Sequence, residues 1–257
     1  MEHADKMGKI IAVANQKGGV GKTTTAINLA ASLALKNKRV LVVDFDPQGM
    51  ATVGLGKSKD GKKGIYQALM NGVYIMDLVQ PTDLDNLYVC PCSPELAGFE
   101  AEIFPEAKRE TRLKDALTNI RPLFHFIFID CPPSLSFLTI NALTAADSIL
   151  IPIQTEFFCM EGLPDLLRTL DEVRSSLNPA LSIEGIILTM FDERTNLSKQ
   201  VAEEVRQSLG GIVFEVIIPR AVRIAEAPSY GQPVILYDIK SKGAQSYLNL
   251  AREILEK

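Results

Sequence analysis

Three glycines and two lysines crowd into one short stretch, K-G-G-V-G-K-T, which runs straight into an amphipathic segment. Glycines let successive backbone N–H groups turn toward one anion, and the positive end of a following helix adds to the attraction. Lys22 could reach terminal phosphates, and the Thr23 hydroxyl is a suitable Mg²⁺ ligand. The stretch therefore predicts a nucleotide site made by Lys17, Gly18, Gly19, Val20, Gly21, Lys22, Thr23 and Thr24.

The stretch departs from the simple phosphate-loop pattern, G-x-x-x-x-G-K-[ST], because Gln16 stands where the first glycine belongs. Lys17 is then a lysine that the pattern does not explain, since Lys22 already occupies the cradle and a second ammonium there would be repelled. We expect Lys17 at the outer rim of the loop. There it could neutralise a nucleotide held by a facing subunit, in the manner of an arginine finger. A lysine that only meets solvent is the simpler alternative.

Three carboxylates follow apolar runs. Asp44 and Asp46 end "RVLVVDFD", and Asp130 ends "HFIFID". Asp44 and Asp46 stand two residues apart, so their side chains point the same way, and two like charges need a nearby cation. Asp130 is expected to hold Mg²⁺ through water. Its alternative role, as a helix N-cap, is disfavoured by the two prolines that follow.

These residues need strands to position them, and continuous apolar runs occur at 9–15, 39–46, 125–130, 147–154, 183–191 and 212–219. Helical patterns lie between them, at 22–38, 109–120, 161–177, 196–208 and 244–256. Such alternation predicts a single α/β domain over 1–257, with a mostly parallel, doubly wound sheet and helices on both faces. Ligands of such sheets bind beyond the carboxyl ends of the strands, where the three carboxylates fall.

Two segments lack a clear pattern. Residues 1–8 are expected to form a flexible N-terminus. Residues 54–108 contain four early glycines and the run "KSKDGKK", so we expect a solvated surface loop. A mobile element that responds to nucleotide is the alternative for this segment.

Composition excludes several classes of protein. The net charge of −4 means that any DNA contact must use a local face. No apolar stretch approaches the roughly 18 residues of a membrane span. Four cysteines without C-x-x-C spacing and only two histidines make a zinc site improbable. The pattern indicates a reduced, cytoplasmic protein.

The sequence resembles a known family from end to end. "KGGVGKTT" is similar to the deviant Walker A motif of the ParA/MinD group of P-loop ATPases, and "VVDFDPQGMAT" and "FIDCPPSLSFLTINAL" are similar to its switch I and its Walker B and switch II regions. "PIQTEFFCMEGL", "LTMFDERTNLSKQV" and the stretch from "IPRAVRIAEAPSYGQPV" onward resemble ParA-type chromosome-partitioning proteins of the Soj kind. Ala221 is a departure, because many relatives have asparagine after "IPR".

The resemblance implies a role for each residue. Lys17 would be the signature lysine that contacts ATP across a nucleotide-sandwich homodimer, and Asp46 would position the attacking water. Asp44 would support the metal shell or the loop, and Asp130 would be the Walker B carboxylate. Pro219 and Ala221 would lie near the adenine. The implied activity is slow, Mg²⁺-dependent ATP hydrolysis that a partner accelerates.

The resemblance also implies partners. Soj-like proteins bind DNA without sequence preference as ATP dimers, associate with the nucleoid and act with a ParB-like centromere-binding protein. The candidate DNA contacts here are Arg194, Arg220, Arg223 and Lys240. Seven basic and seven acidic residues share the region 190–245, so a solvated mixed surface is the alternative.

Three other functions share this type of fold. A MinD-like membrane switch needs a basic amphipathic tail, whereas "SYLNLAREILEK" balances its charges and is typical of a packed helix. An iron–sulfur reductase needs cysteines that ligate a cluster between subunits. An ATP-dependent metabolic ligase would act on a small acceptor. The sequence leaves open whether a partitioned cargo would be a chromosome or a plasmid.

Overall fold

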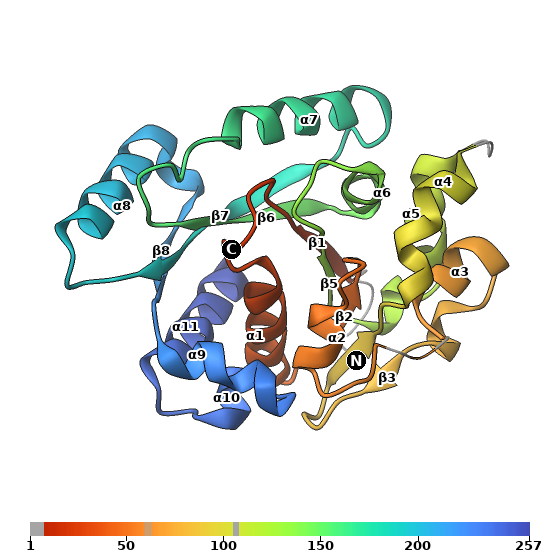
Figure 1. Ribbon diagram of the computed structural model, residues 1–257, viewed down its shortest axis with the longest axis horizontal. Coiled ribbons are helices and arrows are strands. Elements are labelled where there is room, and N and C mark those ends of the chain that lie inside the picture. The colour runs from red at the N-terminus through yellow and green to blue at the C-terminus, as the bar shows by residue number, and fades with distance from the viewer. Residues whose placement is uncertain (1–7, 60, 62, 105–107) are drawn as a thin grey trace, which may run out of the picture.

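The computed structural model describes residues 8–59, 61, 63–104 and 108–257. This part of the chain folds around an eight-stranded sheet in the order β3-β4-β2-β5-β1-β6-β7-β8 (Figure 1). The strands are β1 (Lys9–Val13), β2 (Val40–Asp44), β3 (Gln80–Pro81), β4 (Leu87–Cys90), β5 (Phe126–Asp130), β6 (Ser148–Gln154), β7 (Ser182–Phe191) and β8 (Val213–Pro219).

Every strand pair is parallel except β3 with β4, at one edge. Parallel neighbours need crossover helices, and these cover both faces of the sheet. The predicted doubly wound, mostly parallel sheet is confirmed, and all six predicted strands are present.

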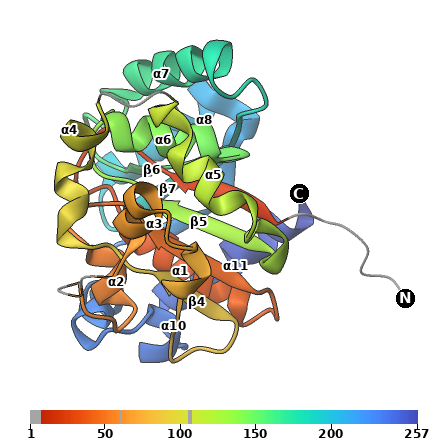
Figure 2. The same ribbon diagram turned by 90° about the vertical axis from the view of Figure 1, so that its right-hand side faces the viewer.

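Helices lie on both sides of the sheet, as the two perpendicular views show (Figures 1 and 2). One layer contains α1 (Lys22–Ala34), α2 (Met50–Gly54), α9 (Val222–Glu226), α10 (Val234–Tyr237) and α11 (Lys242–Glu256). The other contains α3 (Ile65–Asn71), α4 (Phe99–Ile103), α5 (Arg112–Thr118), α6 (Phe137–Ala145), α7 (Leu163–Ser176) and α8 (Asn196–Leu209).

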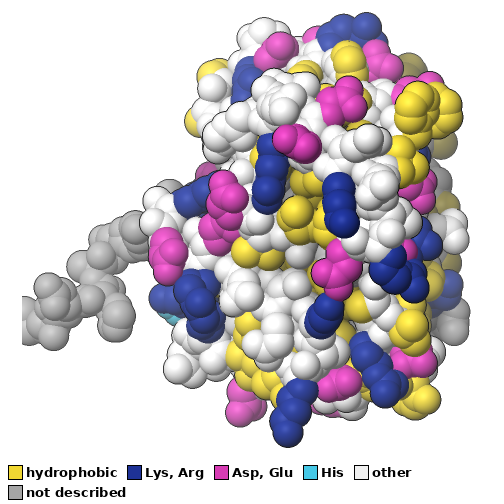
Figure 3. Space-filling model, turned by 90° about the vertical axis from the view of Figure 1, so that its left-hand side faces the viewer, with side chains coloured by type: hydrophobic (Ala, Val, Ile, Leu, Met, Phe, Trp, Pro, Cys, Tyr) yellow, Lys and Arg dark blue, Asp and Glu magenta, His cyan; other side chains and the backbone are white. Residues whose placement is uncertain are grey.

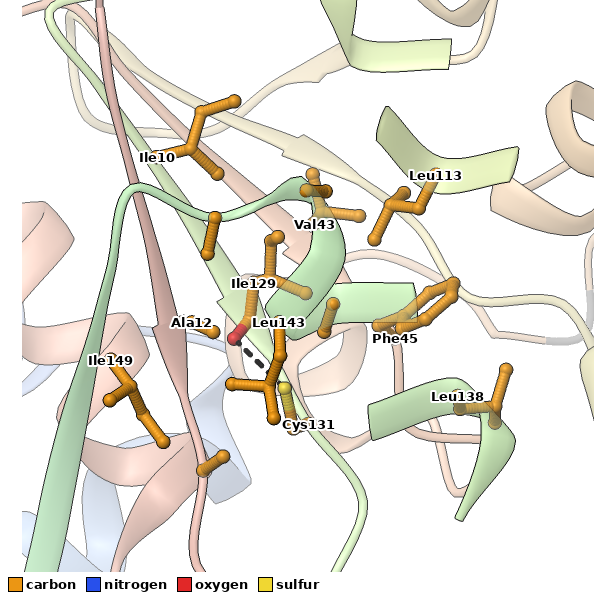
Figure 4. Packing of buried hydrophobic residues seen from close by; sticks show 14 of the residues in the cluster. Ile10, Ala12, Val43, Phe45, Leu113, Ile129, Cys131, Leu138, Leu143 and Ile149 are labelled. Atoms are coloured by element: carbon orange, nitrogen blue, oxygen red, sulfur yellow. Dashed lines mark hydrogen bonds between the residues drawn. The ribbon is translucent and has the colours of Figure 1, made fainter. Parts of the chain in front are cut away.

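Successive residues of β2 face the two layers in turn. Val40 and Val42 pack against α1, while Leu41 and Val43 pack in the second core. Phe45 lies in the same core as Val43 (Figure 4). A strand buried on both faces has no polar side, and this explains its unbroken apolar sequence. None of the helices in the described part of the chain combines the length and apolar character that a membrane crossing requires.

The expectation of a solvated loop at 54–108 is wrong for much of its described part. α3, β3, β4 and α4 lie within this segment, and Ile65, Leu96 and Phe99 are buried in the core. Each of these elements is too short to produce a clear hydrophobic period, which is why the sequence pattern did not reveal them. Helix α6 was missed for a different reason, because it is buried along most of its length and therefore has no polar stripe.

The predicted flexible N-terminus falls mostly on residues 1–7, which lie outside the described residues. Gly8, its last residue, is buried, and its carbonyl oxygen accepts a hydrogen bond from Arg121 Nε at 2.7 Å. An added Cβ at Gly8 would come within 2.1 Å of the Phe124 carbonyl oxygen. Close backbone packing therefore begins at Gly8.

The two edges of the sheet differ in how their backbone groups are satisfied. At β8, the Glu253 carboxylate of α11 accepts hydrogen bonds from the backbone N–H groups of Glu215 and Val216, at 2.8 and 3.1 Å. Arg206 of α8 donates to the Glu215 carbonyl oxygen at 2.8 Å. At the opposite edge, β3 has only two residues, and its second is Pro81.

A substitution at Gly64 tests whether the segment after α2 is packed onto the core. A Cβ at Gly64 would lie 2.6 Å from the Pro91 carbonyl oxygen and 2.9 Å from the Ser93 nitrogen, and both are backbone atoms. We expect Gly64→Ala to lower the free energy of unfolding by about 1–3 kcal/mol, because the backbone must move to make room. Urea denaturation measures this change.

Gly211→Ala is the matched control, since nothing lies within 4 Å of a Cβ there. A Gly64→Ala protein as stable as the Gly211→Ala protein would mean that the segment is loosely attached.

Candidate nucleotide site

The glycine-rich loop joins the end of β1 to the start of α1. Gly19 and Gly21 have φ angles of 74° and 89°, a left-handed conformation that favours glycine. Gly18 and Gly19 are exposed, and α1 begins at Lys22, as expected from the sequence. The loop thus presents backbone and a helix N-terminus to solvent at the carboxyl edge of the sheet, an arrangement suited to binding phosphate.

Lys22 is held inward across this loop. Its side chain is buried, and Nζ donates a hydrogen bond to the Lys17 carbonyl oxygen at 3.1 Å. Burial lowers the pKa of the Lys22 ammonium, and the nearby Asp130, Cys131 and Asp46 act in the opposite direction. The charge of Lys22 is therefore directed toward the interior of the loop.

Lys17 comes directly before the loop glycines and is half-buried. Its backbone N–H donates to Asn15 Oδ1 at 3.0 Å, and Asn15 Nδ2 donates to the Pro152 carbonyl oxygen at 2.7 Å. Asn15 is buried and so fixes the start of the loop to β6. The two lysines thus differ in burial, since Lys22 is buried and Lys17 is half-buried.

Asp44 ends β2 and is completely buried. Its Oδ2 accepts hydrogen bonds from the backbone N–H and the hydroxyl of Thr52, both at 2.6 Å. Burial raises the pKa of Asp44 to about 6, against the lowering effect of the Thr52 hydrogen bonds. Asp46 lies beyond the strand, is half-buried and accepts from the Gln48 backbone N–H at 3.0 Å. The two carboxylates therefore have different surroundings.

Asp130 ends β5 and is also completely buried. Burial raises the pKa of Asp130 well above its usual range, and Asp44 adds to the rise, whereas the Thr23 hydroxyl and the Lys22 ammonium lower it. Within the described residues, both oxygens of Asp130 and Oδ1 of Asp44 are buried without a hydrogen-bond partner. Buried carboxylate oxygens of this kind fit a cation or its bound waters.

The described side chains around Asp44 and Asp130 do not by themselves complete the coordination of a metal ion. The described residues contain no group of three or more His, Cys, Asp or Glu side chains placed to hold a metal ion. Mg²⁺ commonly takes one or two carboxylates together with waters and substrate phosphates, so a partial set of protein oxygens is compatible with it. Thr23, Asp130 and Asp44 are the residues available for that purpose.

Two adjoining cavities surround the loop. One, of about 330 Å³, is lined by the loop glycines, Lys22, Thr23, Thr24, Asp46 and Pro133, among others. The other, of about 360 Å³, is lined by Pro219 and Ala221 together with Met190, Ile224, Pro228 and Tyr247, among others. Gly21, Thr24, Met190 and Pro228 line both cavities. A nucleotide could therefore place its phosphates in the first cavity and its base in the apolar second one.

Sequence reasoning missed several residues of these cavities, including Met190, Pro228, Gln232 and Tyr247. Met190 has a φ of 52°, an unusual conformation for a side chain without a polar end. The next residue back, Thr189, donates from its hydroxyl to the Val20 carbonyl oxygen at 2.8 Å and ties β7 to the phosphate loop. The stretches "IPRAVRIAEAPSYGQPV" and "LTMFDERTNLSKQV" contain Pro228, Gln232 and Met190, but their residue types do not mark these three as cavity residues.

Three of the four candidate DNA contacts are paired with acidic side chains. Arg194 pairs with Asp192 at 2.7 Å, Arg220 with Glu156 at 3.5 Å and Arg223 with Glu226 at 2.9 Å. Lys240 is exposed. Basic and acidic side chains intermingle on the face that carries α8 and β8 (Figure 3). Arg220 also lines the second cavity, so its place is beside the nucleotide site.

Comparisons with known proteins agree with this geometry. A family model described as an AAA domain matches residues 8–183. The chain is 56% identical to the chromosome partitioning protein ParA of Myxococcus xanthus, over 98% of this chain and 89% of that protein. It is 53% identical to the sporulation initiation inhibitor protein Soj of Bacillus subtilis, over 96% and 98%. The chain belongs to the ParA/Soj family of chromosome-partitioning ATPases.

Solved structures similar to this ParA/Soj-family chain include nucleotide-bound proteins. Cobyrinic acid a,c-diamide synthase from Mycobacterium smegmatis, with bound ADP and magnesium, is 36% identical with a TM-score of 0.86, over 97% of this chain and 95% of that one. A putative plasmid partition protein from Borrelia burgdorferi, bound to AMPPNP, is 28% identical with a TM-score of 0.80, over 97% and 99%. The cell division ATPase MinD of Pyrococcus furiosus is 26% identical, with a TM-score of 0.81, over 97% and 99%.

The raised pKa of Asp44 predicts a specific pH dependence. In the folded protein without nucleotide, Asp44 keeps its proton up to about pH 6, whereas in the unfolded chain its pKa is the ordinary 3.8. Between these two pH values the folded state therefore binds more protons than the unfolded state. Its contribution to stability therefore falls as pH rises through this interval, and the loss is complete above the folded pKa. Asp44→Asn has no proton to lose and escapes this loss.

We expect the stability of Asp44→Asn, relative to the parent, to rise by about 1–3 kcal/mol between about pH 4 and about pH 7. Urea unfolding of both nucleotide-free proteins at the two pH values measures the difference. A constant difference would show that Asp44 has the same pKa in the folded and unfolded chains.

Proposed function

We propose that this protein is an ATP-dependent dimerising switch that binds DNA nonspecifically and hydrolyses ATP slowly during the partitioning of a chromosome or plasmid. The observation that carries the proposal is that the two lysines of one loop have different surroundings. Lys22 is buried and bonded across its own loop, whereas Lys17 is half-buried and does not line the phosphate cavity. We place the Lys17 ammonium at the rim of the loop, from which it could reach a nucleotide held by another subunit.

ATP binding would use the two adjoining cavities. The loop N–H groups and Lys22 would bind the phosphates, and the apolar walls made by Pro219, Ala221 and Met190 would hold the adenine. Bound Mg²⁺, ligated by Thr23 and reached through water by Asp130 and Asp44, would compensate charge on the terminal phosphates. The orphaned oxygens of Asp130 and Asp44 support this assignment.

Asp46 is the carboxylate that we assign to the attacking water. It lines the phosphate cavity together with Lys22 and Thr23, whereas Asp44 does not line it and uses Oδ2 to hold Thr52. A carboxylate beside the phosphates can orient a water and accept its proton. Asp44 then holds the structure around the site. We also propose slow turnover that a ParB-like partner accelerates, and the similarity to ParA and Soj proteins supports this part of the proposal.

Dimerisation explains why the nucleotide site is open at the loop. Gly18 and Gly19 are exposed, so one side of the bound phosphates would lie uncovered in a single subunit. Lys17 of a facing copy would cover that side and neutralise phosphate charge, as a cation supplied in trans does in other P-loop NTPases. The dimer would then persist only while the triphosphate is intact. The place of action that we propose is cytoplasmic, on the nucleoid.

Two alternative functions receive less support. The last helix, α11, buries Tyr247, Leu250 and Ile254 against the core, so its apolar side is not available for a membrane surface. All four cysteines are free and buried, which disfavours a cluster shared between subunits. An ATP-dependent metabolic enzyme remains the second candidate, because the Mycobacterium smegmatis structure carries such a name at 36% identity.

Lys17→Ala tests the proposed switch. We expect the variant to bind ATP within a few-fold of the parent but to remain monomeric with a nonhydrolysable ATP analogue, because the phosphate charge of the facing copy is then uncompensated. Light scattering coupled to gel filtration measures the mass. Asp46→Ala is the control, since it removes the water-orienting carboxylate and should keep the dimer. A parent protein that stays monomeric with the analogue would contradict the proposal directly.

Arg223→Glu tests whether Arg223 contacts DNA. Because Arg223 is exposed and reaches solvent despite its pairs with Glu226 and Asp238, we expect its reversal to weaken binding of the ATP-bound protein to nonspecific DNA. The loss should be at least about tenfold at low salt and should shrink as salt rises. Filter binding at two salt concentrations measures it.

Arg168→Glu is the matched control, because Arg168 makes the same kind of pair, with Asp165, on the far layer in α7. Equal DNA affinity for both variants would remove Arg223 from the contact surface.

A further inference from the structure

Asp46 lies in the turn between β2 and α2. The hydrogen bonds made by Asp46 within the turn are local: its carbonyl oxygen accepts from the Gly49 N–H at 2.9 Å, and its Oδ1 accepts from Gln48. Gly49 has a φ of 66° and no side chain that could cap α2. Local bonds shape such a turn but do not fix where it sits relative to the phosphates.

Thr52 fixes the far end of this turn. Its backbone N–H and its hydroxyl both donate to Asp44 Oδ2 at 2.6 Å, so the Asp44 carboxylate caps α2 from the end of β2. Both residues are completely buried. The two ends of the turn that carries Asp46 are thereby joined across a carboxylate that water does not reach.

The same hydroxyl makes a third contact. The Cys92 backbone N–H donates to Thr52 Oγ1 at 3.0 Å, and Cys92 is buried just beyond the end of β4. A hydroxyl has one proton and two lone pairs, so Thr52 can donate to Asp44 and accept from Cys92 at once. The neighbouring Pro91 carbonyl oxygen accepts from the Ile65 N–H at 2.9 Å, which continues the connection into α3.

We propose that Thr52 is a positioning residue for ATP hydrolysis, acting through the turn that carries Asp46. Its hydroxyl locks α2 to Asp44 on one side and to the backbone after β4 on the other, and so sets the place of Asp46 beside the phosphate cavity. This inference rests on the proposed ATPase function and on the role assigned to Asp46. It also makes the segment containing β4 and α3 part of the support of the site.

Thr52→Val removes the hydroxyl while keeping the shape of the side chain. Because a misplaced carboxylate slows the chemical step more than it weakens binding, we expect kcat to fall about 10- to 100-fold. The dissociation constant for ATP, measured with a fluorescent analogue, should stay within about threefold. Thr52→Ser restores the hydroxyl and should bring kcat back to within about threefold of the parent.

Thr144→Val is the matched control. Thr144 is buried in α6, and its hydroxyl donates to the Ile140 carbonyl oxygen at 2.7 Å, so this variant also loses one buried hydroxyl but leaves the turn intact. Its kcat should match that of the parent. If Thr52→Val does not fold, Thr52→Cys, with its weaker thiol donor, should show the same selective loss of kcat in reduced form.

Parental kcat in Thr52→Val, or in Thr52→Cys if that variant is needed, would overturn the proposal. A parallel loss of kcat and ATP affinity, or a loss that serine does not rescue, would overturn it as well. Failure of the proposed function is recognised separately, because the parent protein itself would then hydrolyse no ATP before any variant is compared.

Discussion

Two carboxylates buried beside one buried ammonium are the constraint on which this structure depends. Asp44 and Asp130 end neighbouring strands, directly opposite each other in the β2–β5 register, and Lys22 comes from the loop after β1. Burial and mutual repulsion raise the pKa of Asp130, while burial lowers that of Lys22. Charges so placed are costly in a protein without ligand, and a cation with phosphates would satisfy them.

The fold surrounds this charged centre with rigid supports. Asn15 ties the loop to β6, and Thr189 ties it to β7. Thr52 ties the turn after β2 to Asp44 at the end of β2 and to the backbone just beyond β4. Each tie joins the site to a different part of the sheet. Phe45, between Asp44 and Asp46 in the sequence, packs into the core (Figure 4).

Much of this could be predicted from the sequence, because its strongest signals are local. A short stretch of sequence is enough to recognise the glycine-rich loop, the strand-end carboxylates and the long amphipathic helices. The parts that failed depend on distant contacts. Thr52 gains its importance only from Asp44 and Cys92, and Met190 becomes a cavity wall only because β7 lies beside the loop. The sequence predicts a loop in place of the short elements after α2 because none of them is long enough to show a hydrophobic period.

The sheet edges described above bear on how copies of the chain can meet. Unpaired strand edges invite neighbouring molecules to extend the sheet, an association that no nucleotide could reverse. Here Glu253 and Arg206 occupy backbone groups of Glu215 and Val216 in β8, and the other border is a two-residue strand ending in proline. Both lateral borders of the described sheet are therefore poorly suited to pairing with a strand of another copy.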